Sequence, residues 1–440
     1  MFYTVSFYFS FTIFLVGLLY KVSTWFRHGV GIDAQQIPTS TRVASAIGGM
    51  FSVLFSARVF TLLKVFILDV LFQVRTLRQD GYRWLMHMCI YWGFMVLLLM
   101  HALGKYTTAA FFPDYYSTVN PFLWLRDAAG ILVVVGVLMA VYRRFVRNAL
   151  RPATSAMDMY AMVIVAVIML SGFVLHGVKI TSNTVFQSMV EEFMMSPEEE
   201  EVKALAAYWV QDFGLISPEL QGPFDAALLQ QGKTAHEVSC MQCHSRPQWA
   251  PASYAASRIM APLAGVLDRA GGRTGLFYLH VLACFLGLAY LPFSKMIHIL
   301  TSPSSLLANA VMERGVSAPA NMATKQMLEL DACTHCGACT SRCAMAVTFG
   351  EIPNINILPS EKIASLKTLA AGRKLADREV KVIQQGLMLC TNCNRCTQVC
   401  PVGINLRDMW FSAREALLSR SSAESLLLSP LSFFRTLKQD

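Results

Sequence analysis

The stretch TGLFYLHVLACFLGLAYLPFSKMIHIL, residues 274–300, decides the fold of this chain. It is long and apolar enough to cross the ~30 Å hydrocarbon core of a bilayer as a helix. It also carries His280 and His298, which are 18 residues apart and therefore fall on one helix face. Ionisable side chains inside a membrane span are rare and usually functional. The stretch therefore predicts a membrane helix whose histidines hold a ligand.

Four other stretches share this length and apolar character: Phe2–Trp25, Trp84–Leu103, Phe122–Phe145 and Tyr160–Val178. The composition agrees, because 55% of all residues are hydrophobic and only 15% are charged, against about 25% charged in an average soluble protein. The first stretch lacks the basic start and the small-residue cleavage site of a signal peptide, so we interpret it as a retained anchor. The sequence predicts an all-α membrane helical bundle of five transmembrane helices.

Basic residues orient this bundle, because loops rich in Lys and Arg stay in the cytoplasm. Arginines outside the ambiguous segment Ser45–Phe72 gather before the second span and between the third and fourth: Arg27, Arg42, Arg75, Arg78, Arg83, Arg143, Arg144, Arg147 and Arg151. The loop after the second span contains Lys105 as its single basic residue. We therefore expect a protein of the inner membrane with residues 179–273 in the periplasm and the C-terminal region in the cytoplasm. The net charge of +9 belongs to these loops, and no nucleic-acid partner is expected.

The segment Ser45–Phe72 is ambiguous. It is apolar but carries Arg58, Lys64 and Asp69, and charges at the middle of a bilayer are costly. We prefer an amphipathic helix at the cytoplasmic interface. If the segment spans the membrane instead, only the N-terminus changes sides.

The most specific motif is a duplicated cysteine run near the C-terminus, CxxCxxCxxxC at 333–343 and CxxCxxCxxxCP at 390–401. In ferredoxins with this spacing, three thiolates of one run and the fourth of the other run hold one [4Fe–4S] cluster. The expected ligand sets are Cys333, Cys336, Cys339 and Cys400 for one cluster, and Cys390, Cys393, Cys396 and Cys343 for the other. Zinc needs two CxxC pairs and no third cysteine. Gly337 and Asn392 suit tight turns beside a cluster.

Two histidines of the second span, His87 and His101, are 14 residues apart and also share a face, ~21 Å apart along a helix axis. Facing helices with two histidines each can hold two b haems by bis-histidine ligation. The second and fifth spans are antiparallel, so we expect His87 to pair with His298 at the inner side and His101 with His280 at the outer side. Pro292 would bend or tilt the fifth span to fit the longer spacing.

A third haem is predicted outside the membrane, because Cys240, Cys243 and His244 form the CxxCH signature of covalent c-type haem attachment. The alternatives are a Cys240–Cys243 disulfide and a zinc site. The sixth iron ligand is open between His236, Met260 and His176. The last of these also fits a quinone-site residue or a plain interface residue.

These motifs carry a resemblance. Phe277–Leu300, RWLMHMCIYWGFMVLLLMH in the second span and WFRHG after the first resemble the nitrate reductase γ-subunit family, which implies a five-span, di-haem cytochrome b that oxidises quinol. The last third resembles the iron–sulfur part of heterodisulfide reductase. Together they resemble membrane subunits of heterodisulfide-reductase-related respiratory complexes of anaerobes. The paired-cysteine CCG motif of the catalytic subunits of those complexes is missing, and so is a flavin-binding GxGxxG.

The expected organisation follows the motifs. Residues 1–178 and 274–301 form the di-haem membrane domain, 179–273 an outer insert with the c-type motif, 302–321 a linker, 322–418 a two-[4Fe–4S] domain, and 419–440 a tail. The acidic run Glu198–Glu201 begins a helix in the insert.

The cofactors in this order predict a transmembrane electron-transfer subunit. It would exchange electrons between menaquinone and a cytoplasmic iron–sulfur or flavin partner, with the final catalytic site on another subunit. Lys105, four residues beyond His101, is the candidate quinone-binding residue. The alternative is a conduit between a periplasmic multihaem cytochrome c and the cytoplasm, without a quinone site of its own.

Overall fold

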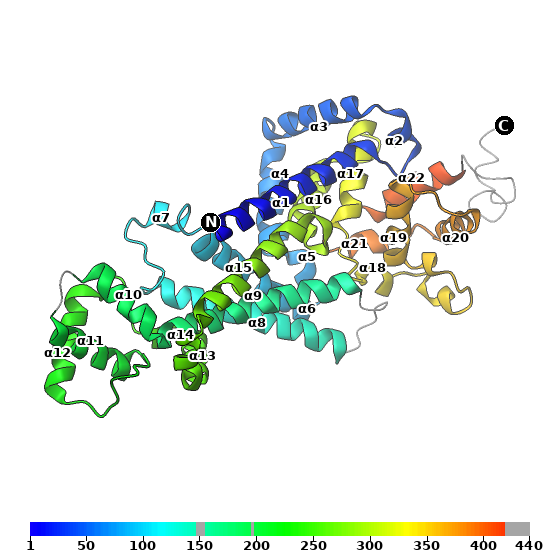
Figure 1. The fold of residues 1–440 in the computed structure, drawn as a ribbon. Coiled ribbons are helices and arrows are strands. Elements are labelled where there is room, and N and C mark those ends of the chain that lie inside the picture. Colours follow the sequence, from blue (N-terminus) through cyan, green and yellow to red (C-terminus); the bar gives the residue numbers. More distant parts are fainter. Residues whose placement is uncertain (147–154, 195–197, 419–440) are drawn as a thin grey trace, which may run out of the picture. The chain divides into compact units, whose positions relative to one another are not determined.

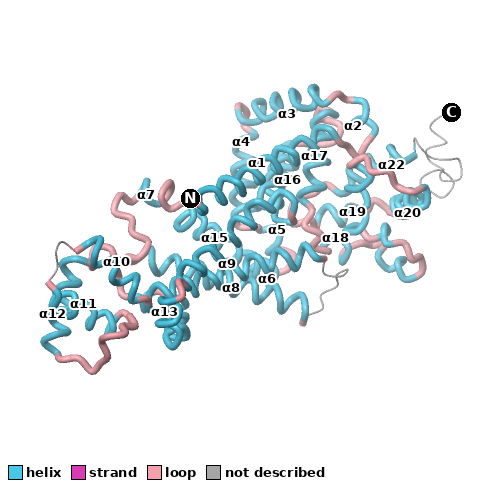
Figure 2. Tube along the Cα trace, viewed as in Figure 1, coloured by secondary structure: helices cyan, strands magenta, loops and turns pink. Residues whose placement is uncertain are grey.

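The computed structural model describes residues 1–146, 155–194 and 198–418, and within these ranges the chain is built from helices and loops without a strand (Figure 2). The predicted all-α architecture is therefore confirmed. Arg147, Arg151 and the tail 419–440, which the sequence predictions used, lie outside the described residues.

Five helical segments of the described chain are long and apolar enough to cross a membrane, as predicted. They are α1 (Phe2–Arg27), α6 (Gly81–Leu97) continued by η2 (Leu98–Ala102), α8 (Phe122–Phe145), α9 (Ala156–Thr181), and α15 (Gly272–Tyr290) continued by η5 (Leu291–Phe293). The protein is thus a multi-pass membrane protein. Its described residues form two compact units, the first from Met1–Ser10, Leu85–Arg147 and Met159–Leu288, and the second from Phe11–Trp84, Asn148–Asp158 and Ala289–Asp440.

The fifth span is not the continuous helix expected over residues 274–300. It ends at Phe293, and η6 (Lys295–Ile297) and α16 (His298–Val311) follow as separate elements. Pro292 has no N–H to continue the helix, and Ser294 is extended, with its Oγ accepting a hydrogen bond from the N–H of Met296 at 3.1 Å. The expectation that Pro292 merely bends the span is therefore wrong. His298 begins a new helix and does not share a helical phase with His280.

The second span also departs from an ideal α-helix. Its last turn, η2, is a π-helix that contains His101. An extra residue in the turn changes the direction in which the following side chains point, and such π turns are frequent at functional sites. The in-phase argument for His87 and His101 therefore applies only up to Leu97.

The segment Ser45–Phe72 is not a single interfacial helix. It forms α3 (Thr39–Leu54) and, after a bend of 93°, α4 (Arg58–Val65) with the π-helix η1 (Phe66–Leu71), as Figure 1 shows. Such a bent pair fits a broken span or a re-entrant loop. Asp69 is neutralised by Arg75, whose Nε lies 3.0 Å from its carboxylate. The charges that argued against a buried segment are thus partly paired.

The insert 179–273 folds into short helices, and the acidic run begins one of them as predicted. They are α10 (Asn183–Phe193), α11 (Glu199–Asp212), α12 (Ala226–Ser239), η3 (Pro247–Trp249), α13 (Pro251–Met260), η4 (Ala261–Leu263) and α14 (Ala264–Arg269), with α7 (Thr108–Phe111) in the loop before α8. Helices α11 and α12 lie side by side (Figure 1). A Cβ on Gly232 would lie 2.0 Å from the carbonyl oxygen of Ala204, so only glycine permits this approach.

The C-terminal region begins earlier than expected. Residues 302–311, predicted as linker, continue α16, and α17 (Pro319–Ala332) starts before residue 321. The remaining helices of this unit are α2 (Ile32–Gln36), α5 (Val74–Leu77), α18 (Ala338–Ser341), η7 (Ala346–Gly350), η8 (Ile355–Ile357), α19 (Pro359–Ala370), α20 (Asp377–Met388), α21 (Arg395–Gln398) and α22 (Leu406–Leu418). Their core surrounds the fully buried Trp410 and includes Val30, from the segment after the first span.

The C-terminal part of α1 is attached to this core through Asp331. The Asp331 carboxylate accepts a hydrogen bond from Trp25 Nε1 at 2.8 Å and lies 3.3 Å from Lys21 Nζ and 2.5 Å from Lys367 Nζ. Burial alone would raise the pKa of Asp331, but the two ammonium groups and the indole N–H hold that pKa below its usual value. A membrane helix and the last domain therefore share one buried ionic contact.

Candidate redox cofactor sites

The two cysteine runs adopt the same backbone shape. In the first, His335 and Gly337 have φ of 55° and 77°. In the second, Asn392 and Asn394 at the equivalent positions have φ of 53° and 66°. Left-handed residues reverse the chain tightly and suit Gly and Asn. The turn expected at Gly337 and Asn392 is thus confirmed. Each run then enters a one-turn helix, α18 or α21, which places its third cysteine.

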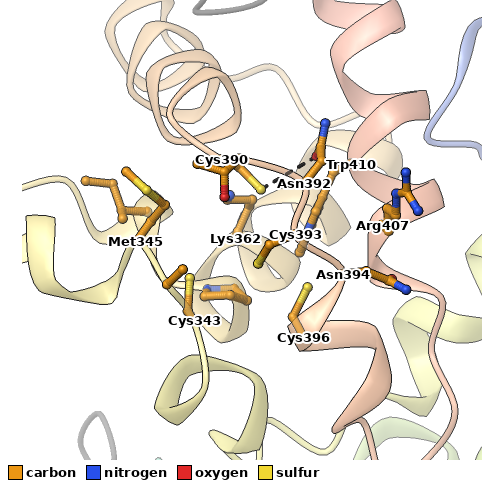
Figure 3. Close-up of a pocket in the computed structure, with 14 residues that line it drawn as sticks. Cys343, Met345, Lys362, Cys390, Asn392, Cys393, Asn394, Cys396, Arg407 and Trp410 are labelled. Atoms are coloured by element: carbon orange, nitrogen blue, oxygen red, sulfur yellow. Dashed lines mark hydrogen bonds between the residues drawn. The ribbon is translucent and has the colours of Figure 1, made fainter.

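The structure brings the cysteines together in two sets, each mixing both runs. Cys343 of the first run lines one pocket with Cys390, Cys393 and Cys396 of the second, and Figure 3 shows their sulfur atoms around a common space. Cys400 lies within electrostatic reach of Cys333, Cys336 and Cys339. These are the two sets that the spacing predicts. Ligation by them remains a proposal, since the grouping shows proximity of thiols only.

The chemistry of these thiols fits a polynuclear iron site. Burial raises the pKa of Cys333 to about 11, and burial with the neighbouring thiols raises the pKa of Cys339 and Cys400 further. Four thiolates in such a place need compensating cations, which iron supplies. No three His, Cys, Asp or Glu side chains of the described residues converge on a single ion. A cube in which each cysteine binds a different iron does not require them to converge.

In the membrane part of the first unit, His101 and His280 face each other with ring centroids 6.3 Å apart. Two imidazoles on opposite sides of one metal, each at a bond of about 2.0 Å, would place their centroids about 6 Å apart. The predicted outer pair thus has a separation that suits bis-histidine ligation.

The contacts of His280 Nδ1 orient the imidazole so that its Nε2 can bind a metal. Its Nδ1 lies 3.1 Å from the carbonyl oxygen of Ile168 and 3.1 Å from Ser171 Oγ. A proton on Nδ1 that is donated to the carbonyl leaves the Nε2 lone pair for a metal. Gly172 keeps this neighbourhood open, because a Cβ there would lie 3.2 Å from the His280 ring.

The predicted inner pair, His87 and His298, is divided between the two units. His87 is half-buried on α6 in the first unit. His298 begins α16 in the second, and its Nδ1 lies 2.6 Å from the carbonyl oxygen of Lys295. This is the arrangement seen at His280, again with Nε2 left for a ligand. The pairing of His87 with His298 stays a prediction.

Two basic residues near the outer pair were missed by the sequence predictions. Arg126 of α8 and Lys179 of α9 both lie within electrostatic reach of His101 and His176. Neither forms an ion pair within the described residues. The adjacent Asp127 is engaged elsewhere, accepting hydrogen bonds from the N–H groups of Ala252 and Ser253 at the start of α13. Propionates of a haem would neutralise such cations. An arginine inside an apolar span was the signal.

The CxxCH motif forms a tight turn at the end of α12. The N–H groups of Cys243 and His244 both donate to the carbonyl oxygen of Cys240, at 3.1 and 2.9 Å. Cys240 packs against the aromatic core of the insert, and its burial raises the pKa of the thiol to about 11. Burial lowers the pKa of His244, which favours the neutral imidazole that a metal needs. The donor set therefore fits a covalent haem.

Among the candidates for the sixth ligand, His236 lies close to this turn, within electrostatic reach of His244. Trp209 is the residue between them, with its ring centroid 5.6 Å from that of His244. However, Trp209 Nε1 donates to Nδ1 of His236 at 3.2 Å. An accepting Nδ1 puts the proton on Nε2, so His236 in this placement is not ready to bind a metal through Nε2.

The remaining candidates also belong to the first unit. His176 is half-buried on α9 and lies within electrostatic reach of His101, which makes it a third histidine at the outer pair. Lys105 is exposed in the turn that follows η2. Met260 ends α13.

Comparison with known proteins gives separate matches for the membrane part and for the cysteine-rich C-terminal part of the chain. Residues 63–211 match the HdrE family model, which describes one subunit of dihydromethanophenazine:CoB–CoM heterodisulfide reductase, and residues 329–404 match the 4Fe–4S dicluster domain. The chain therefore combines a membrane segment similar to HdrE with a 4Fe–4S dicluster domain. No solved structure matches the chain.

Three relatives show how the similarity is distributed. An EtfAB:quinone oxidoreductase of Syntrophomonas wolfei is 21% identical over 89% of this chain and 51% of its own length. The E subunit of the dihydromethanophenazine:CoB–CoM heterodisulfide reductase of Methanosarcina barkeri is 28% identical over 38% of this chain and 67% of its own length. The D subunit of the same reductase from Methanosarcina acetivorans is 30% identical over 23% of this chain and 27% of its own length. The chain thus spans about half the length of the first relative.

Proposed function

We propose that this chain is the membrane electron-transfer subunit of an anaerobic respiratory complex, exchanging electrons between menaquinone and a cytoplasmic iron–sulfur or flavin partner. The observation that carries the proposal is the pair His101 and His280, whose ring centroids are 6.3 Å apart; the proximity of thiols from both cysteine runs supports it. His101 with His280 and His87 with His298 would hold two b haems. The haems and clusters would supply one-electron transfer.

The relatives support a lipid-soluble electron carrier. One is named for quinone and the others for dihydromethanophenazine. Similarity to both the D and the E subunits of one reductase indicates that this chain joins parts that are separate polypeptides there. On this chain, exposed Lys105 follows His101 in the turn after η2 and could donate a hydrogen bond to a quinone oxygen at the outer surface.

The direct test is quinol-dependent reduction. Purified protein with intact haems, mixed anaerobically with a menaquinol analogue, is expected to show reduced haem b in its visible spectrum. Lys105→Ala should slow this reduction, because it removes the proposed donor, while the haem spectrum stays unchanged. Oxidised haems that dithionite reduces but the menaquinol analogue does not would contradict the quinone-linked function.

A second candidate function is a conduit between a periplasmic cytochrome c and the cytoplasm. The turn of Cys240, Cys243 and His244 against the aromatic core of the insert favours it. One haem that stays with the polypeptide after acid–acetone extraction, beside two extractable b haems, is the result expected from pyridine haemochrome spectra.

The matched variant is Cys240→Ala/Cys243→Ala, which removes both thiols and should leave no haem on the extracted polypeptide while both b haems remain. If the unchanged protein retains no haem after extraction, the motif holds no covalent haem and the conduit loses its main support.

A further inference from the structure

A buried lysine lies at the pocket of Cys343, Cys390, Cys393 and Cys396. Lys362, on α19, is 1% exposed and lines this pocket together with the four cysteines. Its ammonium lies 4.9 Å from the ring centre of Trp410, which lines the pocket too. Figure 3 shows the side chain beside the cysteine sulfur atoms. In its protonated form, this ammonium would lie where a cluster carries its added electron.

Lys362 differs from the lysines near the other cysteine set in its lack of an ion pair within the described residues. No ion pair joins Lys362 to an acidic residue in the part of the chain that the structure describes. The cations near Cys333 of the other set are different. Lys367 lies 2.5 Å from the Asp331 carboxylate, and Lys295 lies 2.9 Å from Asp158. Among the described residues, Lys362 is thus a buried cation beside one cysteine set without an ion-pair partner, whereas the two lysines near Cys333 of the other set are paired.

The two sets also differ in their access to solvent. Each set has buried and partly buried members, but the exposed cysteine of the two sets is Cys393, beside Cys396, which is buried. In the other set, Cys339 and Cys400 are buried and Cys333 and Cys336 are partly buried. The other set begins at Cys333, two residues after Asp331, to which Trp25 of the first membrane helix is hydrogen-bonded. Within this unit, the set with Cys333 therefore lies beside the membrane helix, and the set with Cys393 opens outward.

We propose that Lys362 raises the reduction potential of the cluster held by Cys343, Cys390, Cys393 and Cys396 above that of the other cluster. The electron would then rest at the cluster that a cytoplasmic partner can reach past Cys393. The step is a one-electron exchange in which one cluster is oxidised as the other is reduced, with no bond broken and no proton moved. Charge near a cluster acts on its potential over short distances in a buried, low-dielectric site. The inference rests on the proposed ligation of both clusters.

The test is a redox titration of the whole protein followed by EPR. Lys362→Met keeps the length of the side chain and removes the charge. It is expected to weaken the stabilisation of the reduced cluster at least tenfold. For a one-electron couple, a tenfold change lowers the midpoint potential by about 59 mV. Lys362→Arg keeps the charge and should keep the potential high. Lys367→Met is the matched control, since it removes a lysine from the same helix at the other set, and it should leave this potential unchanged.

Non-haem iron and acid-labile sulfide are counted on each sample. These counts distinguish a failure of the proposed cluster ligation from a failure of the proposed role of Lys362. If the unchanged protein lacks iron for two clusters, the proposed ligation fails. If Lys362→Met carries both clusters with an unaltered potential, the role of Lys362 is overturned. If Lys362→Met loses iron, Lys362→Gln is titrated in its place. Loss of iron from both neutral variants, while Lys362→Arg retains it, would assign Lys362 a structural role instead and overturn the proposal.

Discussion

Replacing His280 by alanine is expected to remove one of two b haems from the protein. His280 faces His101 at 6.3 Å, and its Nδ1 is held by the Ile168 carbonyl group and Ser171. Loss of one axial ligand leaves a bis-histidine haem with a single protein bond. The measurement is the ratio of haem b to protein in membranes and after purification, which should fall to about half.

Two variants of the same neighbourhood serve as controls. His176→Ala removes the third histidine near His101 and is expected to leave both haems bound. Ser171→Ala removes one of the two contacts to Nδ1 and leaves the Ile168 carbonyl group. It should keep the haem but alter its potential, because partners of a ligating histidine tune the metal. Two haems in His280→Ala and one in His176→Ala would assign the ligand to His176 and contradict the proposed pair.

Replacing Cys343 by alanine should remove one iron–sulfur cluster and leave the other. Cys343 belongs to the first run but lines its pocket with three cysteines of the second. Non-haem iron should fall from roughly eight to roughly four per chain, with sulfide in parallel. Cys89→Ala is the control, since this cysteine lies on a membrane helix outside both sets.

The double variant Cys343→Ala/Cys390→Ala tests the exchange of ligands between runs. If the two thiols serve the same cluster, the double variant keeps roughly four non-haem irons, as each single variant does. If every run holds its own cluster, the single variants lose different clusters and the double variant loses both. A double variant without non-haem iron would therefore contradict the mixed sets, provided that its haems stay bound and the protein remains folded in the membrane.

The sequence was most informative where a motif determines local geometry. The spacing of the cysteines predicted which thiols come together, and the Gly and Asn residues between them predicted the turns. The helices themselves followed from long apolar runs, whose period and length leave few alternatives. Five spans and the helical C-terminal domain could therefore be predicted without coordinates.

The predictions of helix continuity and of side-chain direction failed where a local change in the backbone ends, widens or bends a helix. Extrapolating a regular helix across residues 291–297 put His298 on the span, whereas Pro292 and the extended Ser294 end that span. The π turn at His101 and the 93° bend after Leu54 are equally local, and apolar composition does not report them. The serine- and proline-rich segment 302–311 was expected to be a linker, but it forms a helix that packs against α17.

Side chains that act on another residue were also beyond the sequence. Ser171 matters only because α9 places it against His280, and Lys362 only because α19 carries it to four cysteines. The sequence shows Arg126 as a charged residue in an apolar span, but it does not show that His101 and His176 lie near it in space. Pattern and spacing identify groups that bind directly, and packing identifies those that assist them.

The contact of Asp331 with Lys21 and Trp25 joins residues that are 310 and 306 positions apart in the chain. The first membrane helix leaves the ribosome long before the residue that it binds has been synthesised. The last domain therefore matures against a partner that insertion into the bilayer has already positioned. Its core also includes Val30, which a fragment starting at α16 would lack. Folding of the C-terminal domain is thus coupled to membrane insertion of the first helix. An error in the insertion of that helix is expected to impair the folding of the C-terminal domain.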